Sequence, residues 1–381
     1  MSPDDAFRAE LRAWLAEHRP PAVEVASSAD DALTLRVWQR TLHGGRWVGI
    51  HWPVDAGGRG ASPAQVATYN EELARAGAPP LLGRVGVTLV GPTLLAHGTE
   101  AQRARFLPRI LGADDVWCQL FSEPDAGSDL ASLSTRAEKR GGAYRVNGQK
   151  VWSSYATFAN MGIALVRTDP TAPPHKGISM LAIPMDAPGV AVRPLRQITG
   201  EPEFNEVFLD DVEVPVDNLI GPENEGWRVA NTTLANERGA SFIWREQVLC
   251  EVALERLREA CQRRGCTRDP IVRQQLVRSW IDVELFRLHN RRTLDRLARG
   301  EEIGAAASIV KLFWASTSQH LYERACALLG PGSLTDDGEM PWGHGLLSTR
   351  ANSIMGGTSE IQRNIIGERL LGLPREPTFR G

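Results

Sequence analysis

The chain has 381 residues, of which 42% are hydrophobic and 23% charged, and its formal net charge is −3. This length allows two or three domains with a large core, and the near-neutral charge gives no case for nucleic acid or an anionic membrane as a partner. No apolar stretch reaches the roughly 20 residues of a membrane span, the acidic start lacks a secretory signal, and five cysteines without C-x-x-C spacing disfavour disulfides and zinc. We therefore expect a cytoplasmic enzyme without a bound metal.

The first part of the chain predicts helices. Phe7, Leu11 and Leu15 recur at four-residue intervals, and residues 33–42 and 66–73 show similar periodicity. A loop rich in Trp, Pro and Gly, "VGIHWPVDAGGRG", separates these two segments, and a further helical stretch runs to residue 111. We predict an N-terminal helical domain over residues 1–112.

The composition changes after residue 112. In "YRVNGQKVWSS", two β-prone arms flank Asn147–Gly148, a pattern typical of a hairpin turn. The segments "MGIALVRTD", "GISMLAIPM", "GVAVRPL" and "NEVFLDDVEVP" are short strand candidates between Pro- and Gly-containing turns. This block predicts a central antiparallel β-domain over residues 113–221.

The helical period returns at Gly226. Leu249, Ala253 and Leu257 are predicted to share one helix face, and residues 271–297 contain no proline. We predict a C-terminal helical bundle over residues 222–381. Helix, sheet and helix in this order predict a mixed α and β fold with a small β-domain between two helical ones.

The common catalytic and nucleotide-binding motifs are absent. The chain has no G-x-G-x-x-G after a strand, no G-x-x-x-x-G-K-[ST], no H-E-x-x-H and no G-x-S-x-G, and its eight histidines are scattered. These gaps disfavour the usual dinucleotide and triphosphate sites and a Ser-His hydrolase.

Two stretches in the predicted β-domain offer polar groups to a ligand. "CQLFSEPDAGSDL", residues 118–130, is a turn-rich loop that either presents hydroxyl and backbone N–H groups to a ligand or is a surface turn. In "GQKVWSS", Trp152 and Ser154 are predicted to lie on one side of a strand. An aromatic ring beside a hydroxyl suits a flat heteroaromatic ligand, although a core tryptophan beside an incidental serine has the same pattern.

A third stretch, "NSIMGGTSEIQRNIIGERL", lies near the C-terminus at residues 352–370. Gly356 and Gly357 precede the capping residues Thr358 and Ser359, and isoleucines and leucines follow at helical spacing. The glycines either form a turn between helices or allow a ligand to approach the backbone closely at the positive end of a helix.

Together these motifs resemble the acyl-CoA dehydrogenase family over nearly the whole chain. The loop "EPDAGSD", the segment "NGQKVW-x-S", the strand "FNEVFLDDVEVP" and the terminal "GGTSEIQRNIIGERLLG" match that family in order and spacing. The resemblance implies N-terminal helices, a β-domain and a C-terminal bundle that also forms the oligomer. It also implies FAD, held without a Rossmann motif.

The resemblance implies roles for residues of the first two stretches. Phe121 and Ser122 would lie beside the flavin and meet its pyrimidine end with backbone N–H groups. Trp152 would pack on the isoalloxazine, and Ser154 would hydrogen-bond near N5. Ser128 would contact the thioester or pantetheine end of the substrate, or serve only its own turn.

Further cofactor contacts are implied in the C-terminal part. Thr358 and Glu360 occupy positions where the family contacts its cofactor. An arginine near the start of the second long C-terminal helix of the family reaches the pyrophosphate of a neighbouring subunit's FAD, and Arg263 is the candidate here. The local sequence "QRRGCTRDP" departs from the common pattern, and Arg264 is the alternative.

Family chemistry needs a carboxylate that removes the proton α to the thioester. Most members carry it directly before the Gly-Thr of the terminal motif, where this chain has Gly356. The stretch "NTTLANERGASF" instead resembles a minority of members, including some that act on branched or long acyl chains, with Glu237 as the base and Arg238 beside it. Burial would raise the pKa of Glu237 and Arg238 would lower it. The Gly356 N–H would polarise the thioester carbonyl, and Glu237 could alternatively form only a surface ion pair.

The expected activity is therefore FAD-dependent oxidation of an acyl-CoA to the trans-2-enoyl-CoA, with an electron-transfer flavoprotein as acceptor and a homotetramer or heterotetramer as the assembly. The glycine at 356 clears space for a branched, cyclic or bulky acyl group. Two alternatives stay open: a non-catalytic or partner-dependent subunit of a mixed assembly, and a flavin oxidase or monooxygenase.

Overall fold

The computed structural model describes residues 3–23, 25–237, 240–335 and 340–375. The chain divides into two compact units. The first, here called the bundle unit, comprises residues 1–11, 62–76 and 238–381, and the second, the sheet unit, comprises residues 12–61 and 77–237. Neither unit is one continuous stretch of sequence, and the domain boundaries expected at residues 112 and 221 stay predictions.

Helices form the first part of the chain where the periodicity predicts them. Ser28 caps the second helix through a capping box with Asp31, and Thr99 caps the fifth through a capping box with Gln102. The helices are α1 (Pro3–Glu17), α2 (Ala29–Gly44), α3 (Pro63–Arg75), α4 (Gly91–His97) and α5 (Glu100–Leu111).

A π-helical turn, η2 (Gly86–Val90), leads into α4. The Gly91 N–H donates to the Gly86 carbonyl, one residue further back than in an α-helix. The Val87 carbonyl instead accepts a hydrogen bond of 3.1 Å from Trp52 Nε1. A Cβ at Gly91 would lie only 1.9 Å from the Trp52 ring, so the glycine is what allows the indole to reach this carbonyl.

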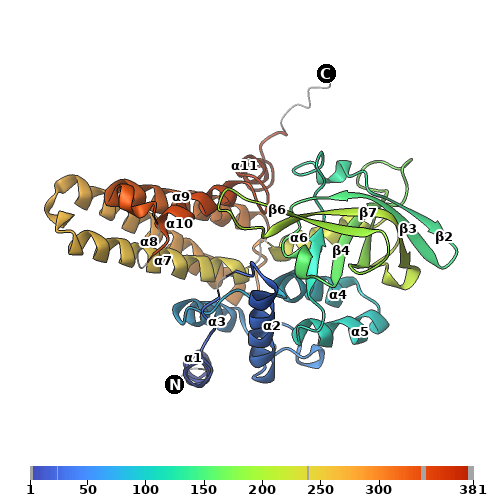
Figure 1. Ribbon diagram of the computed structural model, residues 1–381, viewed down its shortest axis with the longest axis horizontal. Helices are drawn as coiled ribbons and strands as arrows, with labels where there is room; N and C mark the ends of the chain where they lie inside the picture. Colours follow the sequence, from blue (N-terminus) through green and yellow to red (C-terminus); the bar gives the residue numbers. More distant parts are fainter. Residues whose placement is uncertain (1–2, 24, 238–239, 336–339, 376–381) are drawn as a thin grey trace. The chain divides into compact units, whose positions relative to one another are not determined.

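Seven strands form one mixed sheet, drawn in green in Figure 1. The hydrogen-bonded order is β1-β4-β2-β3-β7-β6, with β5 also paired to β4. Most pairs are antiparallel as expected, whereas β1 and β2 both run parallel to β4. The strands are β1 (Trp117–Leu120), β2 (Arg136–Arg140), β3 (Ala143–Lys150), β4 (Met161–Arg167), β5 (Ile178–Pro184), β6 (Val190–Leu195) and β7 (Phe204–Pro215).

The predicted hairpin turn at Asn147–Gly148 is wrong. Both residues lie inside β3, at a bulge in its pairing with β7, and a Cβ at Gly148 would lie 2.3 Å from Thr135 Oγ1. Residues 141 and 142, both glycine, form the two-residue turn between β2 and β3. The glycine at 148 therefore allows β3 to lie close to Thr135, the residue before β2, and does not reverse the chain.

Helix α6 (Gly226–Glu237) follows the sheet and packs against β5. Two hydrogen bonds join it to α4: Thr93 Oγ1 to Thr233 Oγ1 at 2.8 Å, and His97 Nε2 to Thr232 Oγ1 at 2.7 Å. The last turn of α6 therefore starts from a fixed point inside the sheet unit.

The bundle unit is built on three long helices that lie side by side in Figure 1, α7 (Ala240–Arg263), α8 (Pro270–Ala298) and α9 (Ala307–Leu329). The shorter α10 (Trp342–Ser348) and α11 (Ser359–Ile365) pack on α9. Leu249, Ala253 and Leu257 lie in α7 at the four-residue spacing that places them on one face, as predicted. Ala253 and Leu257 are fully buried, whereas Leu249 is exposed and its neighbour Cys250 is buried.

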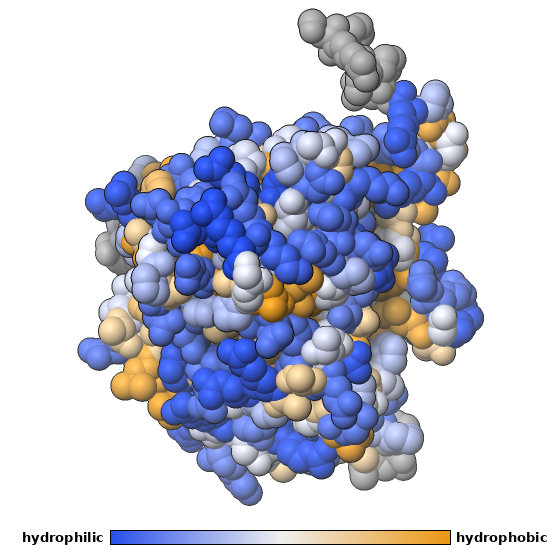
Figure 2. All heavy atoms as spheres, turned by 90° about the vertical axis from the view of Figure 1, so that its right-hand side faces the viewer, coloured by the Kyte–Doolittle hydropathy of each residue, from blue (hydrophilic) through white to orange (hydrophobic). Residues whose placement is uncertain are grey.

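The face of the molecule drawn in Figure 2 is mostly hydrophilic, with hydrophobic residues in scattered spots. Among the residues that the structure describes, none of the helices combines the length and the apolar character that a bilayer crossing requires.

Candidate active site

A buried lysine fixes the loop that follows β1 in the sheet unit. Lys150, the last residue of β3, is fully buried, and its Nζ donates to the Phe121 carbonyl at 3.1 Å, to Glu123 Oε1 at 2.8 Å and to the Leu165 carbonyl at 2.7 Å. The Ser122 carbonyl accepts from the Val151 N–H at 2.9 Å. These bonds fix the backbone of Phe121 and Ser122 against the end of β3.

Glu123 completes this buried network. Its second carboxylate oxygen accepts from the Ser134 N–H at 2.6 Å and from the Ser134 hydroxyl at 2.8 Å, and its first accepts from the Thr135 N–H at 2.9 Å. Burial by itself would raise the pKa of Glu123, but the Lys150 charge and these hydrogen bonds outweigh it and lower the pKa to about 2. Burial lowers the pKa of Lys150 to about 8 even though Glu123 favours its charged form.

The expectation that Trp152 and Ser154 share one side of a strand is wrong. Strand β3 ends at Lys150, and the backbone is left-handed at Trp152 (φ 61°) and again at Tyr155 (φ 57°), which breaks the alternation of side chains. Asn205 of β7, fully buried, holds the segment in place. Its carbonyl accepts from the Ser153 N–H at 3.1 Å, and its amide donates to the Ser153 carbonyl at 2.9 Å.

Trp152 is a large apolar side chain that remains 60% exposed. The ring of Phe204 meets it edge-on, with centroids 5.9 Å apart and the planes at 87°. Ser154, two residues on, is half-buried. An uncovered indole beside a clamped loop with backbone N–H groups has the chemistry needed to stack on and hydrogen-bond to an isoalloxazine ring, so these residues fit a flavin.

Three other expected site residues come from the loop after Glu123 and from the end of α6 onward. Ser128 is exposed in the loop after Glu123. Glu237 is the last residue of α6, and its side chain lies outside what the structure describes. Arg238 lies outside the described residues altogether.

The terminal motif lies in the bundle unit. Gly356 and Gly357 both adopt left-handed backbone conformations, with φ of 65° and 92°. Thr358 caps α11 by accepting from the Ile361 N–H at 3.2 Å, as the sequence predicts. Glu360 is exposed and pairs with Arg363 at 3.4 Å.

Two buried side chains hold the carbonyl groups of this turn. Lys311 Nζ, from the start of α9, donates to the Gly357 carbonyl at 2.8 Å and to the Asn352 carbonyl at 2.9 Å. Gln362 Nε2 donates to the carbonyls of Gly356 and Gly357, both at 3.1 Å. A Cβ at Gly357 would lie 2.6 Å from that amide nitrogen, and the φ of 92° at this residue would strain any side chain, so the turn favours glycine.

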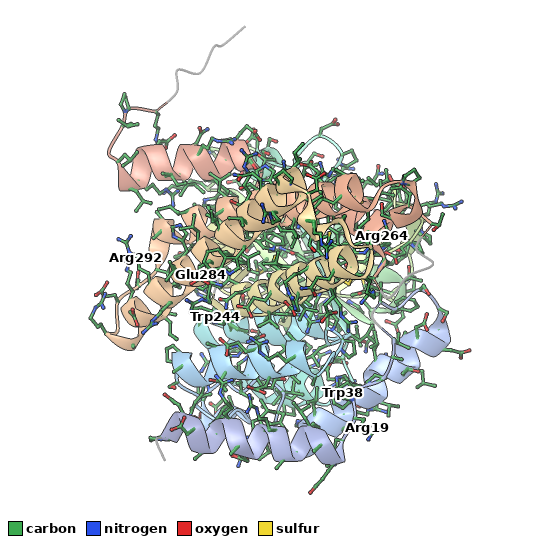
Figure 3. The ribbon with its side chains drawn as sticks, turned by 90° about the vertical axis from the view of Figure 1, so that its left-hand side faces the viewer. Arg19, Trp38, Trp244, Arg264, Glu284 and Arg292 are labelled. Atoms are coloured by element: carbon green, nitrogen blue, oxygen red, sulfur yellow. The ribbon has the colours of Figure 1, made fainter. Side chains whose placement is uncertain are left out.

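The two arginines considered for the pyrophosphate lie elsewhere in the bundle unit. Arg263 is exposed in the last turn of α7, and not near the start of the second long helix, α8, as expected. The Arg264 guanidinium, labelled in Figure 3, hydrogen-bonds to the carbonyl of Leu329 at the end of α9. Lys311 and Leu329 are 18 residues apart along α9, which corresponds to about 27 Å. These arginines and the terminal glycines therefore lie at opposite ends of one helix.

The predicted residues thus form three groups. Phe121, Ser122, Trp152 and Ser154 meet around the end of β3, the residues of the terminal motif meet around the start of α9, and Arg263 is at the far end of the bundle unit. The sequence analysis missed the residues that hold the first two groups. These residues are Glu123, Lys150, Asn205, Lys311 and Gln362, and their local sequence gives no sign that they are buried.

Comparison with known proteins identifies the class. Three family models match: Acyl-CoA dehydrogenase, N-terminal domain, over residues 3–114; middle domain, over residues 118–212; and C-terminal domain, over residues 224–371. The chain therefore belongs to the acyl-CoA dehydrogenase family, a class of FAD-dependent oxidoreductases of lipid metabolism, as its motifs predict.

Individual relatives share the full length. The acyl-CoA dehydrogenase IpdE1 of Mycobacterium tuberculosis is 41% identical over 387 residues, covering 99% of both chains. Among solved structures, the ChsE4-ChsE5 complex from Mycobacterium tuberculosis is 32% identical with a TM-score of 0.86, and the Tcur3481-Tcur3483 steroid ACAD is 31% identical with a TM-score of 0.86. Each covers 99% of this chain and 99% of the chain compared.

Proposed function

We propose that this acyl-CoA dehydrogenase converts an acyl-CoA thioester into its trans-2-enoyl-CoA with Glu237 as the base that removes the α proton. The observation that carries the proposal is Gly356: the position where most of the family places its carboxylate is a left-handed glycine in a turn. Glu237 ends a helix that two hydrogen bonds anchor to α4. A base needs such a fixed starting point to reach one proton reproducibly.

When bound, FAD would supply the acceptor for the hydride that leaves the β carbon. Phe121 and Ser122 would meet the flavin with backbone N–H groups, Trp152 would stack on the ring, and Ser154 would donate near N5. The 2.8–3.1 Å contacts of Lys150 that hold this loop support its role as a rigid donor surface. An electron-transfer flavoprotein is the proposed electron acceptor.

In the terminal motif, the Gly356 N–H would donate to the thioester oxygen, where negative charge grows as the α proton leaves. Thr358 and Glu360 would contact the cofactor, and Arg263 would reach the pyrophosphate of a neighbouring subunit's FAD. The far position of Arg263 along the bundle unit supports a role at a different site from that of the glycines. Ser128 and Arg238 would lie on the substrate side.

We propose a bulky, polycyclic acyl group of the steroid class as the substrate. The absence of a side chain at 356 leaves room near the reacting carbons, and the full-length similarity to the Tcur3481-Tcur3483 steroid ACAD points in the same direction. Straight-chain acyl-CoAs would then be poorer substrates because they leave the same space unfilled.

The test is to mix the purified flavoprotein anaerobically with straight-chain, branched and steroid-bearing acyl-CoAs. The loss of absorbance in the visible flavin band reports reduction of the flavin. Glu237→Gln should keep its yellow cofactor but bleach about 10²–10⁴-fold more slowly. The matched control is Glu225→Gln, which removes an exposed carboxylate just before α6 and should bleach at the wild-type rate. Wild-type bleaching by Glu237→Gln would contradict the assignment of the base.

A second candidate is a partner-dependent subunit of a mixed assembly, favoured by the similarity to the ChsE4-ChsE5 complex and by α8. Buried residues line one side of this helix, whereas its opposite side carries an apolar stripe of exposed residues. The stripe consists of Val277, Trp280, Ile281, Leu285 and Leu288. An apolar helix face of this kind is typical of an interface with another chain, identical or not.

Sedimentation of the chain expressed alone distinguishes the two assemblies. A yellow tetramer supports the homo-oligomeric enzyme, whereas a colourless smaller species supports dependence on a partner. Trp280→Glu should reduce the assembly size in the first case, because it places a charge in the apolar stripe. Rapid reoxidation of the reduced flavin by air would instead support an oxidase or a monooxygenase.

A further inference from the structure

Lys311 is a buried ammonium group in a largely apolar helix, and it faces the terminal glycine turn. The residue is 7% exposed, and its Nζ lies 2.8 Å from the Gly357 carbonyl and 2.9 Å from that of Asn352. Taking a charged amine out of water costs several kcal/mol. A neutral side chain could fill the same space without this cost, so the position calls for an explanation.

Gln362 acts on the same turn from α11. It is fully buried, and its Nε2 donates to the carbonyls of both glycines at 3.1 Å. Lys311 and Gln362 therefore converge on the Gly357 oxygen from two helices. Two separate donors on one carbonyl fix the orientation of its peptide plane.

The direction of the carbonyls determines the direction of the amides. In a trans peptide, the C=O of one residue and the N–H of the next point in opposite directions. Because the carbonyls of Gly356 and Gly357 point at Gln362 and Lys311, the N–H groups of Gly357 and Thr358 point away from these side chains. Lys311 is thus placed to withdraw electron density through the Gly357 carbonyl and to strengthen the Thr358 N–H as a donor.

We propose that Lys311 is a positioning residue for the dehydrogenation: it holds the 356–358 turn so that its amide N–H groups meet the charge that develops on bound ligand. This inference rests on the proposed function. In that reaction the α proton would pass to Glu237 and the β hydride to the flavin, and negative charge would develop on the thioester oxygen between these two steps. Lys311 transfers no proton; it holds in place the turn whose Gly356 N–H is proposed to meet the thioester oxygen, and it orients the neighbouring N–H groups of Gly357 and Thr358.

The test compares Lys311→Met with the FAD-loaded wild type. Loss of one donor to a developing oxyanion costs about 10²–10³ in kcat. Because Lys311 acts through the backbone, we expect a loss of about 10–100-fold in kcat with KM changed less than about threefold. A second readout is the shift of the visible flavin band when a non-oxidisable acyl-CoA analogue binds, which should be smaller in Lys311→Met at saturation. Lys311→Arg, which keeps the charge, should recover part of kcat and part of the band shift.

The matched control is Asp282→Asn, which removes the 2.7 Å ion pair between α8 and Arg324 of α9 within the same bundle unit. It should lower the thermal midpoint and leave kcat and the band shift unchanged. Gln362→Met provides a second variant if Lys311→Met does not fold, with the same expected loss of kcat. A fully active Lys311→Met that differs from wild type only in thermal midpoint would overturn the inference. A wild type that no acyl-CoA bleaches would overturn the proposed function and this inference with it.

Discussion

Lys150 Nζ lies 2.8 Å from Glu123 Oε1, and both side chains are buried beneath the loop that carries Phe121 and Ser122. The same ammonium group also holds the Phe121 carbonyl. A single buried ion pair therefore joins the stability of the sheet unit to the geometry of a proposed flavin contact.

Removing one partner of this ion pair should lower the free energy of unfolding substantially. We expect Lys150→Met or Glu123→Gln alone to lower the free energy of unfolding by about 3–5 kcal/mol, since each leaves its partner buried without compensation. The double variant should lose less than the sum of the two single variants. Urea unfolding followed by circular dichroism measures this. Asp114→Asn, which breaks an exposed pair with Arg40, should cost less than about 1 kcal/mol, and equal costs at the two sites would contradict the argument.

A fall in pH should lower the free energy of unfolding because Glu123 becomes protonated. Its pKa lies at about 2 in the folded chain, compared with 4.5 for an ordinary glutamate, so the unfolded chain binds more protons as the pH falls between these values. The stabilisation is complete above about pH 4.5 and is lost towards pH 2, up to about 3 kcal/mol in total. Glu123→Gln should flatten the dependence of the urea midpoint on pH between 5 and 3. An unchanged slope in this variant would show that other carboxylates govern the acid transition.

Removal of the exposed indole should affect the cofactor more than the fold. Trp152→Ala removes a ring that is 60% exposed, so we expect little change in the thermal midpoint of the apoprotein. The lost stacking, about 0.5–1.5 kcal/mol, corresponds to a rise in the FAD dissociation constant of up to about tenfold. Flavin fluorescence quenching measures it. Val54→Ala, at another exposed apolar position, should leave the affinity unchanged, and unaltered FAD affinity in Trp152→Ala would exclude the stacking role.

The terminal turn should resist side chains at 356. The left-handed conformation at Gly356 costs a residue with a Cβ about 1–2 kcal/mol. Gly356→Ala should therefore lower the free energy of unfolding by about that amount. Gly356→Glu in a Glu237→Gln background should not restore full acyl-CoA oxidation, because the restored carboxylate would sit on a strained turn. Stopped-flow bleaching of the double variant measures this, and recovery to the wild-type rate would show that the turn accommodates the carboxylate.

Local patterns predict much of the fold. The four-residue repeat of α1, the proline-free run of α8 and the Thr358 cap depend on nearby residues, and each was predicted from them. The hairpin prediction at Asn147–Gly148 is wrong because the sequence does not distinguish two uses of glycine. A glycine that avoids a clash with Thr135 and a glycine that reverses the chain look identical in sequence. Only the pairing partner distinguishes them.

Some site residues can likewise be predicted from the local sequence and others cannot. Gly356 and Trp152 belong to recognisable motifs, whereas Lys150 and Asn205 act through partners 27 and 52 residues away, and no local signal reports such a distance. The β-prone neighbours of Trp152 predict a strand there, whereas its backbone is left-handed and the next residue, Ser153, is hydrogen-bonded to Asn205 of β7.

The length of α9 has a consequence for how active sites are shared. One end of this helix holds the terminal glycine turn and the other contacts Arg264, next to Arg263, about 27 Å away. On the proposed assignments, each copy in a homo-oligomer completes its own centre at one end and a neighbour's at the other. Two inactive variants, one lacking Glu237 and one lacking Arg263, should then complement each other when co-expressed, because some hybrid centres contain both residues.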